Sequence, residues 1–477
     1  MRTAGIRKSE TNRGFLNNCS PHDAISALYR LFQQVQRDFN GSLFDDDLEA
    51  ERRKVQPAHI ETLRRFLNGE ELGTGQRVLN FPVYDFSLIP IETISAIYET
   101  FLRSESEERQ TTSGSFFTPR YLAEMTVDVA TESWDTLLNK RCLDPACGSG
   151  IFLVILFNRM AEEWRACNPT VKNTTRARRL RDLLSRNLWG VDVNPTACRI
   201  TCFSLYLAFL DQLQPRDISK LRKELRAENH KVLPPLLALP GKEFANTPTP
   251  RIFAANFFDG RLPLRGRFHL VIGNPPWVGR NQPRDHVLER WVFSNANPSL
   301  SRASGNRQEL QSRFLPQHQS AHAFMWKAPL HLQPDGRACL ILPSKVWLNQ
   351  TDDFQSEWLR RFAVERVLQL ADYRRILFEN AICPATVVLF RPSPVADANM
   401  AIGYDVPKVD KGDPRQALIT IASEDRKFIS LGDLLSAANQ KQSSLVWKQL
   451  LWGTARDVQF LARLLRMPTL GDLAGDP

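Results

Sequence analysis

The residues most able to do chemistry lie in one short segment. An apolar run ends at Gly273 and is followed by Asn274-Pro275-Pro276-Trp277. The prolines fix the backbone and remove two N–H donors, so the Asn274 side chain and the Pro275 carbonyl remain as convergent acceptors. Two acceptors beside the flat wall of Trp277 suit a planar amino group, whose nitrogen becomes more nucleophilic when its hydrogens are held. An Asn-Pro turn is common, but this tetrapeptide at the end of a strand favours catalysis.

An acid and a glycine-rich turn lie upstream of this tetrapeptide. Asp144 ends an apolar strand and is followed by Pro145-Ala146-Cys147-Gly148-Ser149-Gly150, which opens a helix. Glycines let a backbone approach a ligand closely, and a helix N-terminus offers N–H groups. A phosphate-binding loop would continue with Lys and Ser or Thr, whereas Ile and Phe follow here. The turn therefore favours an uncharged or zwitterionic adenosine compound over a nucleoside triphosphate, with a ligand-free strand–helix turn as the alternative.

Two further acids end later strands. Asp192 lies 48 residues after Asp144, where doubly wound folds place an acid that hydrogen-bonds ribose hydroxyls. This spacing exceeds the usual ~20 residues of dinucleotide sites, and a basic segment over 168–186 fills the excess. Asp259 is expected to contact an adenine amino group, with Phe257 or Phe258 beside the ring. The alternative for Asp259 is a plain turn residue.

The elements that must position these residues alternate between strands and helices from residue 114 to 391. Helices between strands imply an α/β fold with a doubly wound, mostly parallel sheet. A long polar segment over 279–320 interrupts this order, and such a loop inside a compact domain is usually functional or disordered. Strands are predicted at residues 142–144, 188–193, 252–254, 270–273, 338–342, 364–370 and 386–390.

The flanking regions have a different pattern. Residues 1–110 are predicted to be mostly helical, with helices over 21–39, 57–67 and 90–102. Residues 401–477 read as a short mixed region, with strand and turn sequence first and helical patterns from Leu434 onward. The sequence thus predicts a helical N-terminal region (1–110), a cofactor-binding α/β domain (111–400) and a mixed C-terminal region (401–477).

Composition is that of an ordinary globular protein. The 477 residues are 43% apolar and 24% charged, without an apolar run of about 18 residues that would cross a membrane. No secretory signal is visible. The eight cysteines form no CxxC pair, which argues against a zinc or disulfide scaffold and for reduced thiols in the cytoplasm. The net charge of +10 favours a polyanionic partner.

Together these motifs resemble those of N6-adenine-specific DNA methyltransferases that use S-adenosylmethionine. The motif order is the γ order of the type I and type IIG restriction–modification methylases, and the likeness covers about residues 111–393. Three more segments carry it. Gly114-Ser115-Phe116-Phe117-Thr118-Pro119 resembles the leading motif, which folds over the methionine part of the cofactor. Residues 336–344 resemble a later core strand, and residues 378–390 resemble the last motif.

The resemblance implies a Rossmann-like class I methyltransferase domain with defined site residues. No metal is expected, because the sulfonium methyl already carries a good leaving group. Catalysis is assigned to Asn274, Pro275, Pro276 and Trp277, and stacking of the extruded target base to Trp277 and Phe378. Cofactor contacts are assigned to Phe117, Thr118, Pro119, Asp144, Ala146, Cys147, Gly148, Gly150, Asp192, Val193, Phe258, Asp259 and Asn274.

The resemblance also implies DNA as the partner. Arg280 and Arg284 are candidates for phosphate contacts, with ordinary surface arginine as the alternative. The run Arg176, Arg178, Arg179 and Arg181 is a weaker candidate. Residues 39–44 and 89–92 resemble the helical region that precedes the core of type IIG enzymes. No Asp…Glu-x-Lys cluster marks a nuclease in residues 1–110, so we expect no cleavage activity.

Two other classes of function stay open. Methyltransferases of ribosomal RNA or of protein glutamine also use Asn-Pro-Pro plus an aromatic residue, and a truncated, non-catalytic DNA-binding subunit is a further alternative. Only 87 residues follow Phe390, too few for a base-reading domain. We therefore expect the chain alone to bind cofactor but to methylate DNA weakly, and to need a specificity subunit or a further C-terminal recognition region.

Overall fold

The computed structural model describes most of the chain as two compact units. One, the first unit, comprises residues 1–99, 136–139 and 148–255, and the other, the second unit, comprises residues 100–135, 140–147 and 256–477. The unit boundary passes through the glycine-rich turn, between Cys147 and Gly148. The structure describes residues 19–39, 48–68, 118–228, 230–238, 251–264, 268–279, 283–295, 307–377, 383–392, 400–409, 419–453, 455–464 and 466–468.

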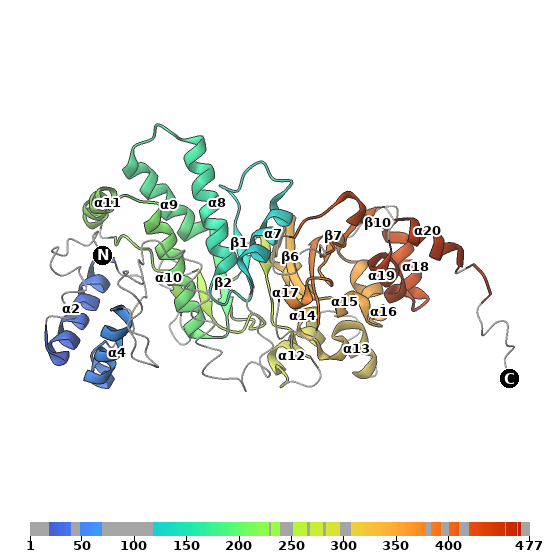
Figure 1. The fold of residues 1–477 in the computed structure, drawn as a ribbon, viewed down its shortest axis with the longest axis horizontal. Coiled ribbons are helices and arrows are strands. Elements are labelled where there is room, and N and C mark those ends of the chain that lie inside the picture. The colour runs from blue at the N-terminus through green and yellow to red at the C-terminus, as the bar shows by residue number, and fades with distance from the viewer. Residues whose placement is uncertain are drawn as a thin grey trace. The chain divides into compact units, whose positions relative to one another are not determined.

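The N-terminal part of the first unit is helical. Helices α2 (Pro21–Phe39), α3 (Leu48–Lys54) and α4 (Pro57–Leu67) follow one another (Figure 1). Their apolar faces share a small core that includes Ile25, Tyr29, Leu48 and Ile60. The helices predicted over 21–39 and 57–67 are confirmed, and the one predicted over 90–102 lies outside the described residues.

The rest of the first unit is built on three parallel strands. Strand β4 (Ile252–Ala254) lies between β2 (Leu188–Asp192) and β3 (Leu237–Ala238). The helices of this part of the unit lie before β2 and between β2 and β3 in the chain (Figure 1). They are α8 (Ile151–Cys167), α9 (Asn173–Asn187), α10 (Pro195–Asp211) and α11 (Pro215–Ala227). Because Asn194 caps α10 by accepting from the Thr196 N–H at 2.9 Å, the chain turns into this helix directly after Asp192.

The second unit carries seven strands in the order β10-β9-β7-β8-β6-β5-β1. Strands β1, β5 and β6 are parallel, whereas β8 and β10 run antiparallel to their neighbours. The seven strands predicted from the sequence correspond to β1, β2, β4, β5, β6, β7 and β8 of the two units, and they and the mostly parallel α/β fold are confirmed. The bounds are β1 Cys142–Asp144, β5 Phe268–Gly273, β6 Leu332–Pro343, β7 Ala363–Gln369, β8 Ala385–Arg391, β9 Ala401–Asp405 and β10 Arg426–Ser430.

Helices of the second unit precede and follow these strands. They are α7 (Arg120–Thr131), α12 (His286–Asn295), α13 (Arg307–Phe314), α14 (Ser320–Lys327), α15 (Lys345–Leu348), α16 (Asp352–Leu359), α17 (Arg374–Leu377), α18 (Leu431–Asn439), α19 (Ser443–Trp452) and α20 (Ala455–Leu464). Short 3-10 turns lie at Pro316–His318, Ala328–His331 and Ser423–Asp425.

The prediction of a long loop over 279–320 is wrong for two stretches, which form α12 and α13. Asp285 starts α12, because its carboxylate accepts from the backbone N–H groups of Val287 and Leu288 at 2.9 and 3.1 Å. Leu288 and Val292 are buried on one face of this helix. A few apolar residues at helical spacing therefore outweigh the polar composition of the segment.

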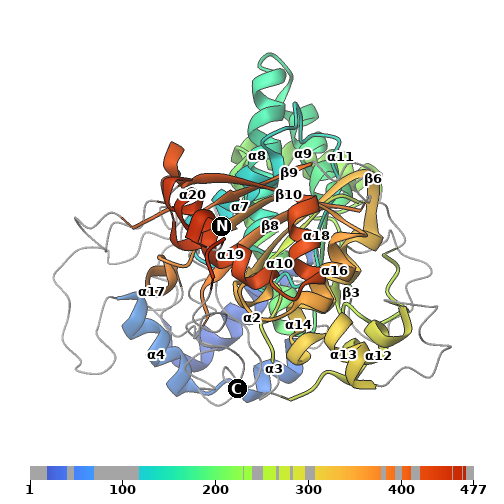
Figure 2. The same cartoon turned by 90° about the vertical axis from the view of Figure 1, so that its right-hand side faces the viewer.

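Much of the region after residue 400 packs into the second unit. Strand β9 pairs with β7, and β10 closes the edge. Trp447 of α19 is fully buried against Trp347 and Tyr404, with ring centroids 5.1 and 5.2 Å away. Figure 2 shows α16, α18 and α19 gathered near these strands. Among the described residues, we find no helix of the length and apolarity that a membrane span requires.

Candidate functional site

The tetrapeptide Asn274-Pro275-Pro276-Trp277 leaves the carboxyl end of β5, between β1 and β6. The Asn274 side chain is half-buried, and its Nδ2 donates to Thr118 Oγ1 at 3.1 Å. Trp277 is only 6% exposed, and its indole N–H donates to the Ile341 carbonyl of β6 at 3.4 Å. The structure thus brings Thr118 and Asn274 together, whereas base stacking by Trp277 stays a prediction.

Asp144 lies against the same strand end. It is 1% exposed, and its Oδ1 accepts from the Ala146 N–H at 3.0 Å, which shapes the turn after β1. A Cβ atom added at Gly273 would lie 2.5 Å from this oxygen. Because residue 273 is glycine, the Asp144 carboxylate has room to lie against the backbone immediately before Asn274. Cofactor contacts by Asp144, Ala146 and Cys147 stay predictions.

Replacing Gly273 by alanine is expected to destabilise the protein by about 1–3 kcal/mol, because the new methyl group must displace the Asp144 carboxylate or Pro145. Chemical or thermal unfolding measures this. Gly260→Ala is the matched control, because a Cβ atom there meets nothing within 4 Å. Equal stability of the two variants would contradict the proposed close approach.

In the first unit, Asp192 fixes the second half of the glycine-rich turn. Its Oδ2 accepts from the Gly148 N–H at 2.9 Å, and its Oδ1 accepts from the Asn194 N–H at 2.8 Å. Burial raises the pKa of this carboxyl group, against the effect of these bonds. The next residue, Val193, is 69% exposed, so an apolar side chain stands open to solvent beside a largely desolvated acid.

Gly148 and Gly150 adopt backbone conformations that favour glycine, with φ of +52° and +88°. At Gly150 an added Cβ atom would also lie 2.9 Å from the Thr201 side chain. The Thr201 hydroxyl donates to the Gly148 carbonyl at 2.8 Å and so braces the turn from α10. Two side chains therefore hold the turn at Gly148: Thr201 bonds to its carbonyl and Asp192 to its N–H.

Phe258 lies in a buried aromatic cluster of the second unit, and the partly exposed Asp259 follows it in sequence. Arg261 binds the Asp259 carboxylate at 2.7 Å and lowers its pKa. The Phe258 ring is 3% exposed and packs on Phe324 with centroids 5.0 Å apart. The Lys327 ammonium lies 5.3 Å from the Phe258 ring centroid, and burial lowers the pKa of this lysine to about 8. An adenine contact by Asp259 or Phe258 stays a prediction.

Sequence reasoning missed Ser320, which holds the loop after the tetrapeptide. Its hydroxyl donates to the Pro276 carbonyl and accepts from the Val278 N–H at 3.0 Å. Its own N–H donates to the Val278 carbonyl at 2.8 Å. A serine at a helix N-terminus is an ordinary sequence feature, so no signal in the sequence tied it to a loop more than 40 residues upstream.

His322 follows Ser320 on α14 and is fully buried, and this burial lowers its pKa to about 3. Between pH 6.5 and 3 the unfolded chain therefore binds a proton that the native protein excludes, so stability falls as the pH falls through this window. The expected loss at pH 5 is about 2 kcal/mol. We expect His322→Phe, which keeps a ring against Phe354, to lose less stability than wild type between pH 7 and 5 in urea titrations. The exposed His286→Gln is the control, and a wild-type pH slope in His322→Phe would contradict this assignment.

Several predicted residues are not described or have other partners. Phe117, Phe378 and Arg280 lie outside the described residues, and Arg284 is exposed. The basic run of α9 faces α11: Arg178 pairs with Glu224 and Glu228 at 3.1 and 2.7 Å. Arg181 donates to the carbonyls of Lys231 and Val232. Both Arg178 and Arg181 therefore bond to other residues of the first unit, which gives the two side chains a structural role.

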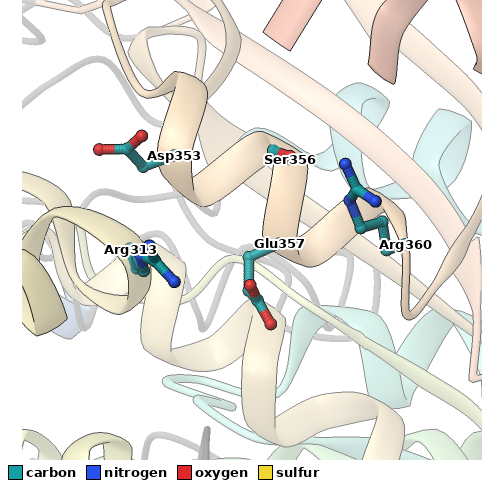
Figure 3. A pocket seen from close by; sticks show the side chains of 5 residues that line it. All are labelled: Arg313, Asp353, Ser356, Glu357 and Arg360. Carbon is teal, nitrogen blue, oxygen red and sulfur yellow. The ribbon is translucent and has the colours of Figure 1, made fainter. Parts of the chain in front are cut away.

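A polar surface hollow lies elsewhere in the second unit, beside α13 and α16 (Figure 3). It contains none of the predicted site residues. Two arginines and two acids line it, so it has no charge excess that would attract an anion. The lining residues are Arg313, Asp353, Ser356, Glu357 and Arg360.

Comparisons with known proteins bear on the family and the fold of this chain. The sequence profile of the N-6 DNA Methylase family matches residues 90–417. The methylase subunit of the type I restriction enzyme MjaIX from Methanocaldococcus jannaschii is 28% identical over 116 residues, which are 24% of this chain and 17% of that relative. The crystal structure of a type I restriction–modification methyltransferase subunit from Streptococcus thermophilus aligns with a TM-score of 0.52 at 14% identity. This alignment covers 92% of this chain and 80% of that one.

Proposed function

Because the chain belongs to the N-6 DNA Methylase family, we propose that it transfers the methyl group of S-adenosylmethionine to N6 of adenine in DNA. It would serve as the modification component of a restriction–modification or related phage-defence system. The observation that carries this proposal is the position of Asn274-Pro275-Pro276-Trp277 at the carboxyl end of β5, with Asn274 held by Thr118 at 3.1 Å.

The chemistry follows from the acceptors at that strand end. The N6 lone pair of adenine is delocalised into the ring, so the amino group is a poor nucleophile. Asn274 Oδ1 and the Pro275 carbonyl would accept its two hydrogens and stabilise the tetrahedral geometry that develops during attack. S-adenosylmethionine would supply the methyl group from a sulfonium centre: as N6 forms its bond to carbon the carbon–sulfur bond breaks, the sulfur leaves as a neutral thioether, and N6 loses one proton to solvent. Positioning and electrostatics would provide most of the rate enhancement.

The residues present fit this cofactor. The turn with positive φ at Gly148 and Gly150 carries no phosphate-binding lysine, as suits an adenosine compound without a phosphate chain. We assign the ribose hydroxyls to Asp192, and the exposed Val193 beside it is a further assigned contact. The remaining assigned contacts are Phe117, Pro119, Asp144, Ala146, Cys147, Phe258, Asp259 and Asn274.

DNA would be bound with its target adenine extruded, because N6 cannot be reached for attack inside the stacked duplex. Trp277 and Phe378 are the residues we assign to stack against the base. The net charge of +10 supports binding of a polyanion. Relatives of this chain are named as subunits of type I systems, so we propose that a specificity subunit or a recognition region supplies sequence discrimination. We place the protein in the cytoplasm, where DNA is its substrate.

The alternatives make different predictions. A methyltransferase for RNA or protein glutamine would modify ribosomes or another protein and leave plasmid DNA unmodified. A non-catalytic subunit would bind DNA without binding S-adenosylmethionine. The glycine-rich turn fixed by Asp192 favours a cofactor-binding chain over the non-catalytic one.

The test is to express the chain in a host that lacks adenine methylation and to sequence the host DNA by a method that detects N6-methyladenine. Expression would be done alone and together with a cognate specificity subunit. We expect methylation at one sequence motif, strongest with the subunit, and none with Asn274→Ala. Unmethylated DNA in both cases, with methylated RNA or protein, would contradict the proposal.

A further inference from the structure

We propose that Thr118 is a positioning residue for methyl transfer, because its hydroxyl orients the Asn274 carboxamide toward the target amino group. This inference rests on the proposed function and gives Thr118 a role distinct from the cofactor contact suggested by family resemblance. The role is defined by one hydrogen bond between residues 156 positions apart, from Asn274 Nδ2 to Thr118 Oγ1 at 3.1 Å.

Both partners are held by rigid elements of the second unit. Thr118 is 6% exposed and directly precedes Pro119, whose carbonyl accepts from the N–H groups of Leu122 and Ala123 at 3.0 Å each. This carbonyl anchors the first turn of α7, which packs on β5 and β6. Asn274 leaves β5 at Gly273, where the Asp144 carboxylate fills the space that a side chain would take. The hydroxyl and the carboxamide are therefore fixed from two sides.

The orientation matters because the two ends of a carboxamide are not equivalent. The nitrogen only donates hydrogen bonds and the oxygen only accepts them. The group is planar, so fixing Nδ2 at Thr118 also fixes the direction in which Oδ1 faces. In the opposite orientation Nδ2 would face the adenine amino group, placing two donors against each other and removing one of the two acceptors that the reaction needs.

Removing the hydroxyl should therefore slow the chemical step without weakening cofactor binding. We expect Thr118→Val to lower the single-turnover methylation rate at saturating S-adenosylmethionine by roughly 10- to 100-fold, the range for a misplaced catalytic group. The dissociation constant for S-adenosylmethionine, measured by calorimetry, should change less than threefold. Thr118→Ser keeps the hydroxyl and should restore most of the rate.

Thr126→Val is the matched control. Thr126 lies on α7, which begins two residues after Thr118. It is fully buried and uses its hydroxyl only locally in the described structure, donating to the Leu122 carbonyl at 2.7 Å. This substitution removes a buried hydroxyl from α7 without touching Asn274, so it should leave the rate unchanged. Thermal unfolding of all variants checks that each is folded.

Three results would overturn the inference. A wild-type rate in Thr118→Val would show that the hydroxyl is dispensable. A loss of cofactor affinity with an unchanged rate at saturation would make Thr118 a cofactor contact instead. A Thr118→Ser variant as slow as Thr118→Val would show that the retained hydroxyl does not sustain the rate, and so that its hydrogen bond to Asn274 is not what matters.

A measurement without turnover separates this inference from the proposed function. The side-chain NH₂ resonances of Asn274, identified by their loss in Asn274→Asp, should shift in Thr118→Val and stay in place in Thr126→Val. If the wild-type protein methylates no DNA, the proposed function fails, while these resonances still report whether Thr118 holds Asn274. Unshifted resonances in Thr118→Val would refute the inference by themselves.

Discussion

Replacing Asn274 by alanine is expected to lower methyl transfer by at least about 10²–10³-fold, the cost of removing one group that stabilises a transition state. The contact between Oδ1 and the N6 hydrogens strengthens as the nitrogen becomes tetrahedral, so it contributes to the rate more than to binding. Affinity for S-adenosylmethionine should stay near the wild-type value. Single-turnover kinetics and calorimetry on the same preparations measure the two effects.

The control for this experiment is Asn295→Ala. Asn295 ends α12, is exposed, and donates to the Trp291 carbonyl within its own helix at 2.9 Å. It should methylate at the wild-type rate. Methylation by Asn274→Ala at that same rate would remove Asn274 from the mechanism and contradict the proposed role of the tetrapeptide.

Replacing Asp192 by alanine is expected to weaken S-adenosylmethionine binding by roughly 10²- to 10⁴-fold, because Asp192 is assigned two ribose hydroxyls and hydrogen bonds to a charged acceptor contribute about 1.5–3 kcal/mol each. The structure adds a second reason. The same carboxylate accepts from Gly148 N–H at 2.9 Å, so its removal also releases the glycine-rich turn. Titration calorimetry with S-adenosylmethionine measures the change.

Two variants make this test specific. Asp192→Asn keeps an acceptor oxygen and the size of the side chain, so it should bind more tightly than Asp192→Ala. Asp211→Ala removes an exposed carboxylate at the end of α10 and should bind the cofactor like wild type. An unchanged dissociation constant in Asp192→Ala would exclude Asp192 as the ribose ligand.

The sequence by itself determined the strands and the residues at their ends. Each strand is a short apolar run bounded by turn-forming residues, which is a local property of the chain. The acids at 144 and 192 and the tetrapeptide after Gly273 follow such runs directly, so their place at strand ends follows from the same pattern. The doubly wound fold follows from the alternation of these runs with helices.

The tertiary structure decided which of these residues meet. The contacts of Asn274 with Thr118, of Pro276 with Ser320 and of Asp144 with Gly273 join segments far apart in sequence. These contacts depend on strand order, register and helix packing. Apolar patterns in the sequence predict the class of fold, and they do not predict these details. A serine or threonine near a helix N-terminus can form several kinds of local hydrogen bond, so the sequence does not predict which distant loop its hydroxyl will contact.

The arginines of α9 also have partners that the sequence does not predict. The α9 arginines read as a basic face because the sequence shows their charge and not their neighbours. Packing of α11 on α9 brings Glu224 and Glu228 to Arg178, which pairs with both acids at the surface. Local turn chemistry thus fixed the candidate reacting groups, while long-range packing fixed their orientation and the partners of the charges around them.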